Sequence, residues 1–404
     1  MLKRSEVRAA LRKNLRWFEC SGLMRPADGS WGVGERVLLT GNNESMELTF
    51  KSFPAWTHHE GYSIMEHRRP DCNFETALLF ELASREFNIP KYHRIAENIL
   101  NYLYNLSGTL NRNKQYPAFA ADVWKWCNIQ WRPAVYFDDN AWCITIPLLL
   151  ARLCPDFEKK FQMRRIALNG ADALAEAFAS ALQSPDWDQQ LGWSGNLKLP
   201  HWGSLAVMAL ASAARENPEK SDSYRALAEQ YQAYVAKDLS AWNTSEQSYA
   251  LLGSLFAAFS WPDCKDFSHH AEELSALTCS LLEQNNGCLP SNHYEAPSGA
   301  HLVDLIYTMN WAFLALHSSW TLQQKPSVSS AFHKMMELLL QIQDRTPSPE
   351  LSGCWRGMYD LEQNCWGGGN RYEGGADSIY SGWTNTTIAL TLCYFLNRRS
   401  IITD

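Results

Sequence analysis

Residues 205–214 read Leu-Ala-Val-Met-Ala-Leu-Ala-Ser-Ala-Ala, and residues 219–232 read Glu-Lys-Ser-Asp-Ser-Tyr-Arg-Ala-Leu-Ala-Glu-Gln-Tyr-Gln. The first segment is apolar nearly all round, as in a helix buried on every side, whereas the second carries one apolar stripe and one polar face. The contrast recurs along the chain, because residues 250–259 and 305–316 resemble the first segment and residues 92–103 resemble the second. Buried helices therefore alternate with helices that face water on one side.

The hydrophobic periodicity predicts helices throughout the chain. They lie at about residues 4–18, 73–87, 91–107, 139–153, 163–182, 200–215, 220–238, 245–260, 266–284, 300–319, 327–343 and 377–397. Fully apolar helices that alternate with amphipathic ones fit two concentric rings, since only an inner helix must bury its whole circumference. The spacing between inner helices is too uneven for an open solenoid. We predict an all-α fold, an (α/α)6 barrel, in which Pro147 kinks one inner helix.

Residues 1–404 are predicted to form a single domain of this kind, with a β-hairpin insertion at about residues 31–53. Two alternating segments, residues 31–39 and 46–50, flank the turn signal Gly41-Asn-Asn43 there.

The composition excludes several classes of protein. Hydrophobic residues make up 46% of the chain and charged residues 20%, which is not the composition of a disordered protein. The net charge is −7 and no Lys/Arg cluster appears, so we expect no nucleic-acid partner. No stretch reaches the roughly 18 uncharged apolar residues that cross a bilayer, so we expect no membrane partner. The oligomeric state has no signature in the sequence.

The cysteines and the N-terminus bear on the compartment. The 11 cysteines are odd in number and show no Cys-x-x-Cys spacing, and the charged N-terminus lacks the apolar run of a secretory signal. We expect a cytoplasmic protein with reduced thiols, or a periplasmic or secreted one if an export signal has been trimmed.

The segments that precede the inner helices are rich in carboxylates, histidines and tryptophans. Asp138-Asp139 is the sharpest of them, because one aspartate could cap the helix that begins near Asn140, but capping does not easily explain both. Two adjacent like charges would raise one pKa and favour a protonated acid beside an ionised partner. Glycosidic-bond cleavage needs that division of labour between two carboxyl groups.

Further candidates lie in the same segments and in the Gly-rich stretch of residues 366–377. Asp377 is a third candidate acid, although a helix cap explains it equally well. The candidates for substrate binding are Arg69, Asp71, Asn140, Trp142, His201, Trp202, His301, Asp304, Arg356, Arg371, Glu373, Tyr380 and Trp383. Thr244 and Gln247 form a capping-box pattern, which would place Glu246 in an exposed first turn.

The helix pattern, Asp138-Asp-Asn-Ala-Trp142 and Gly374-Gly-Ala-Asp-Ser-Ile-Tyr-Ser-Gly-Trp-Thr-Asn385 together resemble the six-hairpin glycosidase superfamily. That superfamily includes the α-1,6-mannanases and the unsaturated uronyl hydrolases. The likeness covers residues 70–400 as architecture but only these stretches as motif. Resemblance to the mannanases implies that Asp138 and Asp139 are nucleophile and acid/base.

The substrate expected from this resemblance is an oligosaccharide. The loops carry more Arg and His than a neutral sugar demands, so we expect the oligosaccharide to contain a uronic acid, which Arg69, Arg356 and Arg371 would bind through paired hydrogen bonds. We expect no cofactor and no metal, because His58-His59 and His269-His270 lack the spacing of a His-Glu-x-x-His site.

Two other classes of function remain open. A sugar epimerase of the acylglucosamine 2-epimerase kind also uses an (α/α)6 barrel but works through histidine bases, for which His201 and His301 are available. A non-catalytic carbohydrate-binding barrel would use the acids only as helix caps. A terpene cyclase is a weaker alternative, since Asp138-Asp-Asn-Ala-Trp lacks the further acid of an Asp-Asp-x-x-Asp site.

Overall fold

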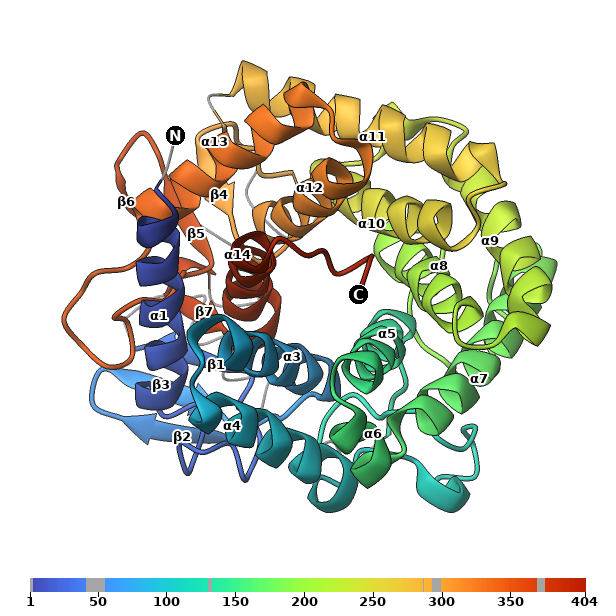
Figure 1. Cartoon of the computed structure of the whole chain (residues 1–404), viewed down its shortest axis with the longest axis horizontal. Coiled ribbons are helices and arrows are strands. Elements are labelled where there is room, and N and C mark those ends of the chain that lie inside the picture. Colours follow the sequence, from blue (N-terminus) through green and yellow to red (C-terminus); the bar gives the residue numbers. More distant parts are fainter. Residues whose placement is uncertain (1–2, 41–54, 130–132, 286, 293–298, 369–374) are drawn as a thin grey trace.

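The computed structural model describes residues 3–40, 55–129, 133–285, 287–292, 299–368 and 375–404. Its helices form two concentric rings (Figure 1). The inner ring contains α3 (Pro70–Phe87), α5 (Phe137–Leu153), α8 (Pro200–Ala214), α10 (Thr244–Ser260), α12 (Met309–Gln323) and α14 (Thr387–Asn397). The outer ring contains α1 (Arg4–Cys20), α4 (Pro90–Asn101), α7 (Met163–Gln183), α9 (Ser221–Val235), α11 (Lys265–Gln284) and α13 (Pro326–Ile342). The predicted (α/α)6 barrel is confirmed.

The burial of the two rings follows the sequence pattern. Every residue of α8 from Gly203 to Ala214 is buried, whereas α9 buries a single stripe that includes Tyr224, Ala228 and Tyr231. The inner helices α8 and α10 approach closely at Gly253, where a Cβ atom would lie 2.5 Å from the backbone oxygen of Ser204. The sequence alternation therefore reports which helices have neighbours on all sides.

Strands occupy two small sheets at the ends of the helices. Strands β1 (Arg36–Leu39), β2 (Trp56–His59), β3 (Tyr62–Met65) and β7 (Ser378–Tyr380) form an antiparallel sheet in the order β2-β3-β1-β7, in which Val37 pairs with both Ile64 and Ile379. Strands β4 (Leu302–Asp304), β5 (Met358–Asp360) and β6 (Cys365–Trp366) form the second sheet. The first predicted strand contains β1, but the predicted partner at residues 46–50 lies outside the described residues.

Two predicted helix starts are wrong. The helix predicted at residues 300–319 is β4 and a turn followed by α12, because Asp304 ties down that turn. The helix predicted at residues 377–397 begins as β7 and the π-helix η6 (Ser381–Thr386) before α14, because residues 378–380 pair with β1. The helix predicted at residues 91–107 is confirmed in extent, since the π-helix η1 (Tyr102–Leu106) follows α4 directly. The prediction also missed the short α6 (Pro155–Phe161).

The two ends of the chain close the barrel. Asn14 of α1 donates hydrogen bonds to Asn385 (2.9 Å) and to the carbonyl of Gly353 (3.1 Å), which joins the first helix to the last hairpin. The C-terminal segment crosses the end of the barrel where α5 and α8 finish (Figure 1), and Arg215 donates to the carbonyl of Ile402 at 2.7 Å there. The opposite end, at which the inner helices begin, is left for a site. Within the described ranges, no helix combines the length and the apolar character that a membrane span requires.

Candidate active site

A pocket of about 360 Å³ lies where the inner helices begin. Every inner hairpin contributes to its wall, through the first two turns of α3, α5, α8, α10 and α12 and through η6 before α14. The described residues that line it are Arg69, Asp71, Trp126, Tyr136, Asp138, Asp139, Trp142, His201, Trp202, Leu205, Tyr249, Tyr307, Trp311 and Trp383. The pocket thus brings together eight of the residues predicted from the sequence: Arg69, Asp71, Asp138, Asp139, Trp142, His201, Trp202 and Trp383.

Arg69, at the N-cap of α3, is a buried cation that organises the acids of the pocket. Its guanidinium donates to both oxygens of Asp71 (3.2 and 2.9 Å), to Asp139 Oδ1 and to Glu35 Oε1 (3.4 Å). The ring of Trp383 covers it at 4.3 Å, and the indole N–H of Trp383 donates to Asp71 at 3.2 Å. Arg69 is therefore held on several sides before any substrate arrives.

The aspartates Asp138 and Asp139 lie in the first turn of α5. The N-cap of this helix is Tyr136, so neither aspartate has the capping role considered from the sequence. Asp138 Oδ1 and Asp139 Oδ2 are buried and accept no hydrogen bond from the described residues. Both side chains line the pocket.

Burial controls the protonation of these two acids. It raises the pKa of Asp139 well above its ordinary value against the opposing charge of Arg69, and the charges of Asp71 and Asp138 raise it further. Burial also raises the pKa of Asp138, although the nearby His201 and Arg69 lower it. The cause of each shift is the cost of an ionised carboxylate away from water beside like charges. These shifts favour a proton on the pair of carboxyl groups.

The geometry also brings Asp71 close to Asp139. Asp71 Oδ2 and Asp139 Oδ1 both accept from the same nitrogen atom, Nη2 of Arg69. Because each hydrogen bond spans about 3 Å, these two oxygens lie at most about 6 Å apart. Carboxyl groups from α3 and α5 therefore share one side of the pocket.

His201 has a partner that sequence reasoning missed. Its Nδ1 lies 3.0 Å from Glu246 Oε1, and its backbone N–H donates to Glu246 Oε2 at 2.7 Å. Glu246 is only 1% exposed, and Asn243 caps α10 by accepting from the Glu246 N–H. The predicted capping box and the exposed position of Glu246 are both wrong. The sequence feature that could have identified Glu246 as a functional residue is its position as an acid in the first turn of an otherwise apolar inner helix.

Aromatic rings form most of the remaining wall. Trp142 stacks on Trp311 (centroids 5.2 Å apart, 20° between planes), and Trp202 lies 3.5 Å from the ring of His201. The indole N–H groups of Trp202 and Trp311 find no acceptor among the described residues. Sequence reasoning missed Trp311, Tyr136, Tyr249 and Tyr307 and left open whether Trp126 is a core ring or a pocket ring, because the sequence pattern does not distinguish the two.

Two of the predicted binding residues make hydrogen bonds within the fold. Asn140 bonds to the backbone N–H and C=O of Trp124 at 2.8 and 3.0 Å. Asp304 accepts from the N–H groups of Ile306 and Tyr307 and from the hydroxyl of Thr308.

The other predicted binding residues lie behind or away from the pocket lining. Arg356 is paired with Asp344 at 2.7 Å, and Tyr380 stacks behind Trp383. His301 and Asp377 are not among the described lining residues. Arg371 and Glu373 lie outside the described residues.

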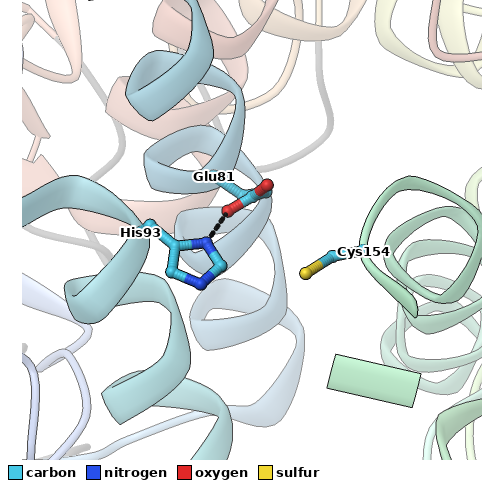
Figure 2. Close-up of side chains that lie close together, drawn as sticks. All are labelled: Glu81, His93 and Cys154. Atoms are coloured by element: carbon cyan, nitrogen blue, oxygen red, sulfur yellow. Dashed lines mark hydrogen bonds and ion pairs between the residues drawn. The ribbon is translucent and has the colours of Figure 1, made fainter. Parts of the chain in front are cut away.

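A second group of chemically active side chains lies away from the pocket. Glu81 of α3, His93 of α4 and Cys154 after α5 each offer a ligand atom, within 4.8 Å of one another (Figure 2). Glu81 already accepts from His93 Nδ1 (2.7 Å) and twice from the guanidinium of Arg85 (2.9 and 2.7 Å). Because Arg85 would repel a bound cation, we assign this group to the ion-pair network that joins α3, α4 and the end of α5.

Comparisons with known proteins find solved structures with a similar fold. No family model and no curated protein matches the sequence. The structure of cellobiose 2-epimerase from Spirochaeta thermophila is similar, with a TM-score of 0.64 and 14% identity over 98% of this chain and 96% of that chain. D-mannose isomerase has a TM-score of 0.62 and 13% identity over 98% of each chain. Unsaturated glucuronyl hydrolase from Streptococcus agalactiae has a TM-score of 0.60 and 13% identity over 100% of this chain and 94% of that chain.

These similar structures are enzymes that act on sugars, and they divide between hydrolysis and epimerisation or isomerisation. At this identity the likeness concerns the fold, which is the one predicted from the helix pattern. The chain is a six-hairpin (α/α)6 barrel, the architecture that these epimerases, isomerases and glucuronyl hydrolases share.

Proposed function

We propose that this protein hydrolyses a glycosidic bond of an oligosaccharide, and that Asp138 and Asp139 carry out the reaction. The observation that carries the proposal is this pair of pocket-lining carboxyls, whose pKa values burial raises and each of which has one oxygen without a hydrogen bond in the described part of the chain. A protonated carboxyl donates to the leaving glycosidic oxygen, while an ionised one attacks the sugar or activates water. Asp71 lies beside Asp139 on Arg69 and helps to set its charge. Asp377 has no part in this proposal.

The aromatic wall suits a sugar ring. The rings of Trp142, Trp202, Trp311 and Trp383 line the pocket and give it apolar surface against which the C–H groups of a pyranose pack. A pocket of about 360 Å³ is at the small end of ligand sites, so it accepts the end of a chain rather than its middle.

We propose further that the sugar in this pocket is neutral. The expectation of a uronic acid rested on Arg69, Arg356 and Arg371. Arg69 and Arg356 are engaged by carboxylates of the protein, and Arg371 lies outside the described residues. A substrate carboxylate would meet the lining acids Asp138 and Asp139 with no unpaired cation among the described lining residues to offset them. Because unsaturated glucuronyl hydrolases have this fold, a uronide is the informative comparison substrate.

The alternative is a sugar epimerase, the activity of the cellobiose 2-epimerases with this fold. His201 favours it, since an oriented imidazole can act as a base. The epimerase resemblance implies several histidine bases, however, whereas His201 is the single histidine among the described lining residues. This difference is the reason to place hydrolysis first.

Product analysis on a panel of oligosaccharides separates the two reactions. A hydrolase releases a new reducing end and shortens the chain, whereas an epimerase conserves chain length. Asp138→Asn and Asp139→Asn should each lower kcat by at least about 100-fold, the low end of general acid–base contributions, without unfolding the protein. Asp186→Asn, at an exposed position, is the matched control. Near-normal kcat in both folded pocket variants would rule out the assignment.

A further inference from the structure

Glu246 is a buried acid that touches the pocket only through another residue. It lies in the first turn of α10 and is 1% exposed, yet it is not among the described residues that line the pocket. Both of its oxygens are used by His201 of α8, one by the backbone N–H at 2.7 Å and one by ring nitrogen Nδ1 at 3.0 Å. Its own N–H is held by Asn243 at 3.0 Å. The carboxylate is thus fixed at the boundary between two inner helices.

An ionised carboxylate accepts hydrogen bonds and cannot donate them. The Nδ1 atom of a neutral His201 must therefore carry the proton in the bond to Glu246, which leaves Nε2 as the nitrogen that can accept a proton from the pocket. The orientation of the ring is further restricted by Trp202 at 3.5 Å and Tyr249 at 5.4 Å. Both the direction and the tautomer of the imidazole follow from its neighbours.

The charged groups around His201 come from three inner helices. Glu246 approaches from α10, and Asp138 approaches from α5, close enough that a proton gained by His201 would lower the pKa of Asp138 against the effect of burial. Arg69 and Asp139 line the same pocket from α3 and α5, and Tyr249 lies beside the ring. A hydrogen-bonding imidazole beside Asp138 can bind a substrate hydroxyl or move a proton at the reacting end of the sugar.

We infer that Glu246 is the positioning residue of the pocket, which fixes His201 as its Nδ1–H tautomer so that Nε2 faces the substrate next to Asp138. This inference rests on the proposed function, because the reaction that His201 would assist is the proposed glycoside hydrolysis. The bond to the backbone N–H also stabilises the start of α8, and this capping role must be separated from the positioning role.

Glu246→Gln separates the two roles. The side-chain oxygen of glutamine still accepts from the backbone N–H of His201, whereas its NH2 group faces Nδ1 and favours the opposite tautomer, with the proton on Nε2. A comparable exchange of Asp for Asn behind a catalytic histidine leaves the geometry intact and inverts the tautomer in serine proteases. Glu273→Gln is the matched control, because its partner His269 forms an exposed pair at 3.2 Å on the outer helix α11.

The experiment records the ring ¹⁵N shifts of His201 by NMR and the steady-state kinetics of the same samples. We expect the Nδ1–H tautomer in the unmodified protein and the Nε2–H tautomer in Glu246→Gln, with kcat lowered at least about 10-fold and KM little changed. An unchanged tautomer, or a normal kcat with an inverted tautomer, would overturn the inference. Tautomer inversion in a protein that epimerises instead of hydrolysing would overturn the glycosidase proposal and support the role of Glu246.

Discussion

Arg69 forms ion pairs with three acidic side chains at the pocket. Its single positive charge is paired with three carboxyl groups, those of Asp71, Asp139 and Glu35, and its own side chain is only 5% exposed. Removing one partner of a buried ion pair leaves the other charges uncompensated, which costs about 3–5 kcal/mol. We therefore predict that Arg69→Met lowers the free energy of unfolding by about 3–5 kcal/mol at pH 7 in urea titrations.

The stability loss in Arg69→Met should depend on pH, in a direction set by the pKa of Asp139. Arg69 lowers the pKa of Asp139 against the effect of burial, so its removal raises that folded-state pKa further above the unfolded value. The folded variant then binds more protons than its unfolded state, and its stability rises as the pH falls. The deficit of Arg69→Met should shrink between pH 7 and pH 5. Lys325→Met, which breaks an exposed pair with Glu272, should cost only about 0–1 kcal/mol at either pH, and an equal cost in both variants would contradict the assignment.

Among individual residues, the sequence could identify polar side chains that stand where an apolar residue is expected. Asp138, Asp139, His201 and Arg69 are polar residues at the starts of apolar helices, and all four line the pocket. Glu246 has the same character but was explained by a capping pattern that does not form. Trp311 gave no signal, because a tryptophan inside an apolar helix reads as core whether or not it faces a cavity.

Among the elements, periodicity identified each ring of helices but missed segments whose backbone is set by a distant partner. Residues 378–380 form a strand because β1 lies beside them, a contact between positions that are far apart in the chain. Residues 302–308 leave the helical conformation because β4 pairs with β5 and Asp304 binds the following turn. Local pattern alone cannot report such long-range pairing.

Asp304 provides a test of this turn. Burial raises its pKa to about 6, although the hydrogen bonds from Ile306, Tyr307 and Thr308 lower it. An unfolded aspartate titrates near pH 4, so between about pH 4 and pH 6 the folded protein holds a proton that the unfolded chain has lost. The contribution of Asp304 to stability therefore falls as the pH rises through this window.

Asp304→Asn removes the titration but keeps an oxygen for the two backbone N–H groups. From pH 4 to pH 6, the free energy of unfolding of the variant should rise relative to that of the unmodified protein by about 1–3 kcal/mol. Urea titrations at several pH values measure the difference. A difference that is constant across the window would show that Asp304 is charged throughout, and Asp186→Asn serves as a surface control.

For the molecule as a whole, the barrel is closed by contacts between its first and last elements. Asn14 binds Asn385, and the C-terminal segment, with Ile402 fully buried, covers the end of the barrel opposite the pocket. The alternation of apolar and amphipathic helices predicted the two rings but not this cover, because a short C-terminal tail has no hydrophobic periodicity. The cover leaves the helix starts as the open end for a substrate.

The charge of the molecule bears on its substrate at long range. The net charge is −7, and Asp71, Asp138 and Asp139 line the pocket beside the paired Arg69. An anionic sugar approaches against this field, whereas a neutral one does not. We therefore predict that kcat/KM for a neutral hexoside exceeds that for the corresponding uronide with the same leaving group.

Salt distinguishes this long-range effect from a fit inside the pocket. The Debye length falls from about 30 Å at 0.01 M salt to about 8 Å at 0.15 M, so added potassium chloride should narrow the preference by raising kcat/KM for the uronide. The neutral hexoside, assayed in the same salt series, controls for effects on the protein itself. Equal kcat/KM at low salt would remove the electrostatic argument. A preference for the uronide would instead mean that cations outside the described lining, such as Arg371 in its Gly-rich segment, bind the carboxylate.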